Sequence, residues 1–236
     1  SSDKRPPLKL LQQQLRSNQY EIKDLGIAEG LGSEIPADAS IVFIMGPEKP
    51  FLPEEIATIQ RAVNRGVRLL IALEGDGDGE PLDEILGSLG LKFDKTLLAN
   101  ERAFVRVTGT TADRYHVFSN RYSSHASVTT MTRNATKIAT LLSRSGSIDK
   151  LEPTPPGLRV DMVLNALDAT FRDANGNLEH DEGEEKKGFG LAAAVTRTST
   201  GASDQSRIFV FADVDTFTDK YVKFSGNPYL FGDIVY

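Results

Sequence analysis

Two short apolar runs, separated by an amphipathic segment, constrain the fold of this chain more than any other feature. The runs are Ile41–Met45 and Val67–Leu73. Each is apolar almost throughout, as strands of a parallel sheet are when both faces are covered. Between them, Pro53 and two acidic residues are suited to begin a helix, and Gly66 is suited to end it. We therefore expect a βαβ unit with parallel strands and a right-handed crossover.

The other segments predict more strands and helices. Helices are expected from Leu8, over residues 81–89 and from Asn227. Strands are expected at residues 20–25, 103–107, 115–118, 137–142, 191–196 and 208–212, whereas residues 161–167 fit a strand or a helix. We predict one α/β domain over residues 1–236. It would comprise a βαβ core (about 1–100), an inserted β-rich region with an acidic loop (101–200), and a closing strand and helix (201–236).

Composition excludes several kinds of site. The chain has no cysteine, which rules out thiol nucleophiles, disulfides and cysteine-bound metals. It has 27 Lys and Arg against 33 Asp and Glu, and this balance argues against a nucleic-acid partner. No run approaches the 18 apolar residues of a membrane-spanning helix, and residues 1–6 do not resemble a signal peptide. The sequence stops inside an apolar pattern, so we expect it to be a domain of a longer protein.

The most specific local motif is an acidic loop over residues 173–184. It resembles the calcium loops of many exported bacterial proteins. Oxygen-bearing side chains recur at the spacing by which a 12-residue loop surrounds Ca²⁺, with a backbone carbonyl from position 7 and a bidentate carboxylate from position 12. The candidate ligands are Asp173, Asn175, Asn177, Glu179, Asp181 and Glu184. Leu178 departs from the pattern, which has glycine at this position. The alternative interpretation is a solvated hairpin loop; a bound Ca²⁺ would be structural.

Carboxylates at strand ends offer a second possible site. Asp213 and Asp215 follow an apolar run, as in the nucleophile motif of haloacid-dehalogenase-type phosphatases. That motif opens the phosphatase fold, whereas only 21 residues follow Asp215 here. We therefore interpret these acids as caps of the following turn. A metal-dependent hydrolase using Asp213, Asp215 and Asp76 stays an alternative.

No catalytic residue and no organic cofactor is predicted. The three histidines are not at metal-binding spacing from one another, and Ser124 and His125 are too close in sequence to face each other as nucleophile and base. A third hypothesis is a receptor domain with a small-molecule pocket at the strand carboxyl ends.

Several segments in order resemble the family of ABC-type transport auxiliary proteins that includes the gliding-motility protein GldG. The matching stretches are Ile35–Ala39 before a buried strand, Gly46–Phe51 before the helix, Asn64–Leu70, Val210–Phe217 and Gly226–Pro228. Together they cover the chain from about residue 8 to its end.

The resemblance implies a flavodoxin-like, mainly parallel sheet flanked by helices, akin to class I glutamine amidotransferases, with extra β structure in the middle. It also implies a domain on the periplasmic face of the bacterial inner membrane, anchored by transmembrane helices outside this chain. Its partners would be ABC-transporter membrane or ATPase subunits or other envelope proteins. Because the amidotransferase nucleophile is a cysteine and this chain has none, the function expected from the resemblance is non-catalytic interaction or ligand sensing.

Overall fold

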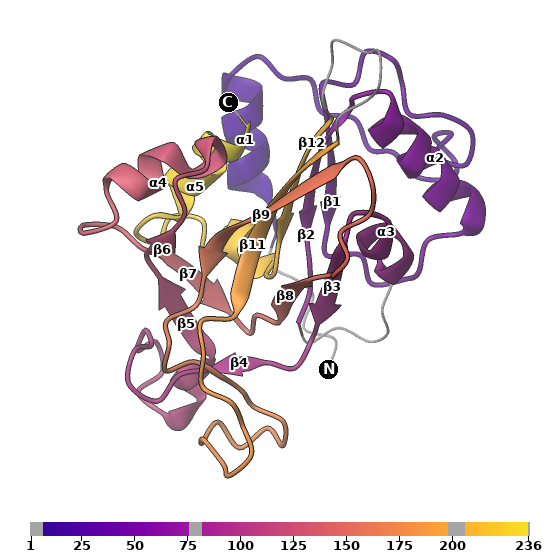
Figure 1. The fold of residues 1–236 in the computed structure, drawn as a ribbon. Coiled ribbons are helices and arrows are strands. Elements are labelled where there is room, and N and C mark those ends of the chain that lie inside the picture. The colour runs from indigo at the N-terminus through magenta and orange to yellow at the C-terminus, as the bar shows by residue number, and fades with distance from the viewer. Residues whose placement is uncertain (1–6, 76–81, 198–205, 236) are drawn as a thin grey trace.

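The computed structural model describes residues 7–75, 82–197 and 206–235 (Figure 1). Its centre is an eight-stranded mixed sheet. The strand order is β1-β2-β12-β11, and the far edge of β11 pairs with both β9 and β8; β6 then pairs with β9, and β3 with β8. The strands are β1 (Ile41–Met45), β2 (Arg68–Ala72), β3 (Leu91–Asp94), β6 (Arg121–Tyr122), β8 (Ser147–Lys150), β9 (Leu158–Asn165), β11 (Gly190–Arg197) and β12 (Ser206–Phe211).

Two small antiparallel sheets and several short helices complete the described structure. One small sheet joins β4 (Leu98–Ala99) to β10 (Phe171–Arg172), and the other joins β5 (His116–Ser119) to β7 (Thr140–Ser143). The α-helices are α1 (Lys9–Ser17), α2 (Pro53–Asn64), α3 (Asp83–Ser88), α4 (Thr129–Arg133) and α5 (Asn227–Val235). The 3-10 helices are η1 (Thr111–Tyr115), η2 (Ala126–Val128) and η3 (Asp215–Phe217). None of the helices within the described ranges has the length and apolar character needed to span a bilayer.

The predicted βαβ unit is confirmed. β1 and β2 are parallel, with pairs from Ile41 and Arg68 to Met45 and Ala72. The first turn of α2 is capped by the Glu55 carboxylate, which accepts a hydrogen bond from the backbone N–H of Leu52 at 2.7 Å. The helix ends before Gly66, whose φ of +95° is the left-handed conformation in which glycine is favoured.

Helices cover both faces of the main sheet. On one face, α2 and α3 pack Ile59 and Ile85 into a core that includes Ile71 of β2. On the other, α1 and α5 contribute Leu11 and Phe231 to a second core. The central strands are therefore buried on both sides, which explains why β2 and β12 are nearly continuous apolar runs.

The expected flavodoxin-like, mainly parallel sheet was wrong. Only the pairs β1–β2 and β2–β12 are parallel, whereas every other pair in the main sheet, β11–β12 included, is antiparallel. The direction of pairing follows from the length of the segments that connect neighbouring strands. Parallel neighbours need a crossover of a dozen or more residues, usually a helix. Only residues 198–205 separate β11 from β12, and no helix lies between β9 and β11 among the described residues.

Single-element predictions had mixed outcomes. The ambiguous segment 161–167 lies largely in β9, and a helix begins at Asn227 as expected. Residues 20–25 are not a strand; Tyr20 and Ile22 pack instead against the core beside α1. Residues 103–107 contribute only an isolated bridge from Phe104 to Val117. β3 and β8 were missed, because their sequences contain charged residues and are too short to show a clear alternation.

Candidate calcium-binding loop

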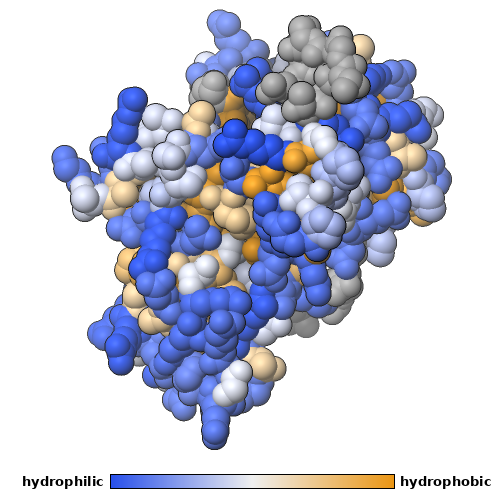
Figure 2. Space-filling view, viewed as in Figure 1, coloured by the Kyte–Doolittle hydropathy of each residue, from blue (hydrophilic) through white to orange (hydrophobic). Residues whose placement is uncertain are grey.

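The acidic loop begins after β10 and extends from one end of the molecule (Figure 1). It is tied at its base: the backbone N–H of Asp173 donates to the carbonyl of Leu97 at 2.8 Å, and Lys186 forms a bridge with Phe171. In the space-filling view, the part of the molecule that contains this loop is mostly hydrophilic (Figure 2). The loop therefore lies outside the two hydrophobic cores while its two ends are held by short β contacts.

Asp173 organises the first half of the loop. Its side chain is buried, unusually for a carboxylate in such a segment. Oδ1 accepts the backbone N–H of Gly176 and Oδ2 that of Leu178, both at 3.0 Å. Leu178 has a φ of +61°, the left-handed conformation that calcium loops place at their glycine position. The departure seen in the sequence therefore leaves the turn intact, at the conformational cost of a side chain in this region.

Three further candidate side chains meet at one point. The amide nitrogens of Asn175 and Asn177 both donate to Oδ2 of Asp181, at 2.6 and 2.8 Å. The amide oxygens accept backbone N–H groups two residues ahead, at Asn177 and Glu179. These Asx turns fix the alternating direction of the side chains.

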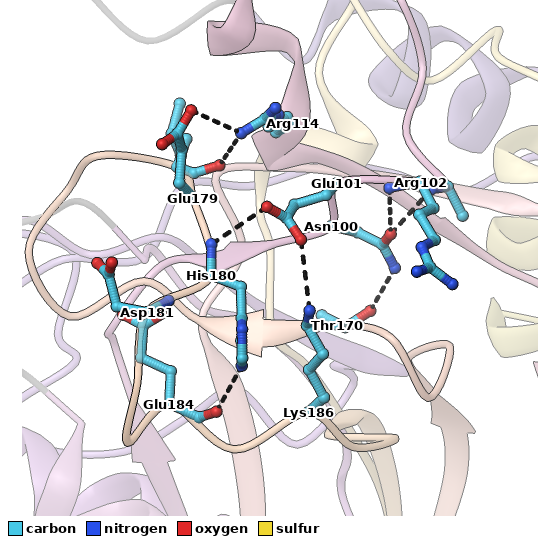
Figure 3. Close-up of polar contacts among 12 residues, drawn as sticks. Asn100, Glu101, Arg102, Arg114, Thr170, Glu179, His180, Asp181, Glu184 and Lys186 are labelled. Atoms are coloured by element: carbon cyan, nitrogen blue, oxygen red, sulfur yellow. Dashed lines mark hydrogen bonds and ion pairs between the residues drawn. The ribbon is translucent and has the colours of Figure 1, made fainter.

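Glu184 closes the loop onto its beginning. Oε1 accepts the N–H of Ala174 at 2.9 Å, and Oε2 accepts the N–H of Asp181 at 3.1 Å. Both carboxylate oxygens are thus directed into the loop, as a bidentate ligand at position 12 requires. The Glu179 side chain instead points outward to Arg114, at 3.5 Å, which leaves position 7 only its backbone carbonyl as a ligand (Figure 3).

The donor set fits Ca²⁺ in kind, since all six candidates offer oxygen. In the parts of the chain that the structure describes, no group of three or more His, Asp or Glu side chains is placed to hold a metal. To supply the six or more oxygens that Ca²⁺ takes, the loop needs the amide oxygens of Asn175 and Asn177 as well as its carboxylates. Binding would require Asn175 and Asn177 to turn amide oxygen toward Asp181, and the carboxylates to share their oxygens between the ion and the backbone N–H groups.

Sequence reasoning missed the residues that support the loop from outside. Arg114 donates to the carbonyl of Leu178 at 2.9 Å, and Glu101 accepts the N–H of His180 at 3.3 Å (Figure 3). That hydrogen bond lowers the pKa of Glu101, aided by Lys186, whose Nζ lies 3.3 Å from Oε2. The supports lie far from the loop in sequence, so no local pattern identifies them.

The strand-end acid Asp213 is structural in this geometry. It is 1% exposed. Oδ2 accepts the N–H of Ser143 at 2.8 Å and the hydroxyl of Thr216 at 2.7 Å, and Oδ1 accepts the N–H of Asp215 at 2.9 Å. Burial, reinforced by the charge of Asp215, raises the pKa of Asp213 well above its usual range. Asp213 therefore caps the following turn, as interpreted from the sequence, whereas the capping role given to Asp215 stays a prediction. Asp76, the third carboxylate of the hydrolase hypothesis, lies outside the described residues.

A buried chain of polar side chains was also missed. Tyr221 lies with its hydroxyl 3.1 Å from Nε2 of His116 and accepts a hydrogen bond from the Ser143 hydroxyl at 3.2 Å. Nδ1 of His116 lies 3.7 Å from Oδ1 of Asp113 and has no hydrogen-bond partner among the described residues. Burial lowers the pKa of His116, outweighing the attraction of Asp113.

Asp113 is held ionised by its neighbours. Burial opposes its charge, but hydrogen bonds from Thr108 and Gly109 outweigh this and lower its pKa to about 2. An acid, an imidazole and two hydroxyls are thus close together. Each of the four side chains is at most 6% exposed, so the group faces the interior rather than a surface.

The other two histidines lie elsewhere. Nδ1 of His125 is 2.8 Å from the hydroxyl of Ser127, and Nε2 of His180 is 2.8 Å from the carbonyl of Glu184. The structure therefore does not bring the three histidines together.

Of the comparisons with known proteins, only the one with solved structures found a match, and it bears on the fold. Neither the scan of protein-family models nor the search of curated proteins found a match. Among solved structures, the protein is similar to a chain described as "mmIFT52 N-terminal domain", with a TM-score of 0.67 and 16% identity. The alignment covers 98% of this chain and 88% of that one. At this identity the likeness shows the fold alone. It spans the antiparallel strands as well as the parallel ones, in agreement with the mixed sheet.

Proposed function

We propose that this chain is a non-catalytic, extracytoplasmic interaction domain of a membrane-anchored ABC-transport auxiliary protein, and that its acidic loop binds one structural Ca²⁺. The GldG-like order of segments supports the cellular role. Under this proposal the domain lies on the periplasmic face of the bacterial inner membrane. Its partners are the ABC-transporter membrane or ATPase subunits or other envelope proteins.

The observation that carries the calcium proposal is the internal order of the loop. Asp173, Asn175, Asn177 and Glu184 each accept backbone N–H groups of the same loop. Leu178 has the left-handed φ that the glycine position of a calcium loop requires. The backbone turn is already in place, and binding requires the amides of Asn175 and Asn177 to turn their oxygens toward Asp181.

Burial supports the non-catalytic part of the proposal. Among the described residues, the groups that resemble catalytic machinery are Asp213 and the cluster of Asp113, His116, Ser143 and Tyr221, all buried. A nucleophile and its base must reach a bound substrate. These groups instead face the interior, where most of their polar atoms bond one another or the backbone around them.

Calcium binding is tested on metal-stripped protein by calorimetry and thermal unfolding. At a Ca²⁺ concentration one hundred times the Kd, binding stabilises the fold by about 2.7 kcal/mol, which is roughly 5–10 °C for a domain of this size. Glu184→Gln should abolish the shift. Glu185→Gln is the matched control, because this exposed neighbour pairs with Lys187 outside the ligand set. An absent shift, or equal effects of the two variants, would dispose of the site.

The membrane role is tested separately. The flanking sequence of the full-length protein should contain apolar spans of about 20 residues, and the full-length protein should co-purify with the ABC subunits when they are co-expressed. A full-length protein with no such span would refute the membrane anchor. Turnover of an ester, amide or phosphate substrate that a single substitution abolishes would refute the non-catalytic role.

A further inference from the structure

A cavity of about 250 Å³ lies between α2 and α3, on the face of the sheet away from α1 and α5. In the space-filling view, apolar atoms appear in the region where Figure 1 draws these two helices (Figure 2). The apolar part of the lining comes from Ile59 and Val63 of α2, and from Ile85 and Leu89 at α3. All four are at most 5% exposed, so the floor is part of the packed core. Gln60, Asn64, Ser88 and Arg197 complete the lining.

Arg197 gives the cavity a positive charge. It is the last residue of β11, and its Nε is buried without a hydrogen-bond partner among the described residues. The described residues that line the cavity include no carboxylate. A guanidinium N–H that is buried and unsatisfied costs free energy, which an anionic group beside it would recover.

Arg197 is the one cationic side chain that the described residues contribute to the cavity lining. Arg68 of β2 and Arg207 of β12 lie at the same end of the sheet, but strand alternation places them on the opposite face, with Leu70 and Phe209. The nearby carboxyl end of α2 has a partial negative charge that opposes an anion, but the full charge of Arg197 exceeds it. This is the amino end of β2 and β12, opposite to where the sequence predicted a pocket.

We propose that this cavity binds a monocarboxylate with an unbranched aliphatic chain, its carboxylate on Arg197 and its chain against Ile59, Val63, Ile85 and Leu89. The volume equals about eight waters at roughly 30 Å³ each, which suits a chain of about six to eight carbons. The site shares no residue with the acidic loop, so it stands or falls independently of calcium binding.

The test is isothermal calorimetry of the whole chain with butanoate, hexanoate and octanoate, because the protein has no tryptophan for a fluorescence signal. The Kd should tighten about fourfold for each added methylene group until the cavity is full. 1-Octanol and octylammonium should bind at least tenfold more weakly than octanoate, since neither can satisfy Arg197. Equal binding of octanoate and 1-octanol would overturn the proposal, and so would no binding of octanoate.

Variants locate the site. Arg197→Gln should weaken octanoate binding by about 10- to 100-fold, the loss expected for charge-assisted hydrogen bonds. Arg207→Gln is the matched control at the same end of the sheet and should change the Kd less than threefold. Gln60→Trp, which adds bulk at the cavity mouth on α2, should block every chain length while circular dichroism stays unchanged.

Unchanged binding in Arg197→Gln, or in Gln60→Trp, would overturn the assignment. A second copy of this chain as the true occupant would appear as octanoate binding that weakens with rising protein concentration, and that result would also reject the proposal.

Discussion

The turn at Leu178 permits a direct test of the loop conformation. We compare Leu178→Gly with Leu178→Ala. Both variants remove the same partly buried side chain, so the difference between them isolates the backbone. The φ of +61° places residue 178 in the left-handed region, where an L side chain costs about 1–2 kcal/mol and glycine costs almost nothing.

The expected magnitude follows from two opposing terms. Glycine also loses more backbone freedom on folding than alanine, by roughly 0.5–1 kcal/mol. A net advantage of about 0.5–1 kcal/mol therefore remains for the glycine variant. For a chain of 236 residues this corresponds to a Tm difference of about 1–4 °C.

The assay is urea denaturation of metal-stripped protein, followed by the same measurement in Ca²⁺. The glycine variant should be the more stable of the two in both conditions and should bind Ca²⁺ at least as tightly as the alanine variant. If the alanine variant equals or exceeds the glycine variant, residue 178 is not left-handed in solution. The description of the loop as a calcium-type turn would then be wrong.

Two further predictions concern the buried polar groups. Thr216→Val should lower the free energy of unfolding by about 1–3 kcal/mol, because it leaves the buried Asp213 carboxylate without a donor at 2.7 Å; Thr216→Ser should retain most of the stability, and equal losses in urea melts would refute the role of the hydroxyl. Because burial lowers the pKa of folded His116, its contribution to stability is complete above the unfolded pKa of about 6.5 and is lost as the pH falls through the folded value. Urea midpoints from pH 8 to 5 should therefore fall, and His116→Gln should flatten this part of the profile; an unchanged slope would contradict the assignment. Asp113, with a folded pKa of about 2, should add its own loss only at pH values below about 3.8.

Several features of the fold and of the candidate site could be predicted from local sequence. The βαβ unit was predicted because two apolar runs and a capped amphipathic helix each carry their own periodicity. The candidate calcium loop, whose binding stays a prediction, was recognisable because its oxygen-bearing side chains recur at fixed spacing within one segment. The capping role of Asp213 followed from its place directly after an apolar strand. In each case the signal lies within one segment or in segments that follow one another directly along the chain.

Only the tertiary structure decided the rest. The direction of strand pairing was predicted wrongly, because the family resemblance implied a mainly parallel sheet and the sheet is mixed. Eight residues, 198–205, connect β11 to β12, which is too few for the crossover that parallel neighbours need, so the two strands pair antiparallel. The supports of the loop are Glu101 and Arg114, which act on residues 79 and 64 positions away. His116 contacts Tyr221 across 105 positions, and the cavity joins Arg197 to two helices of the first 90 residues. Such contacts form between elements that pack against each other in the folded chain. The local periodicity of a sequence indicates which side of a helix or strand is buried, but it does not indicate which other element covers that side.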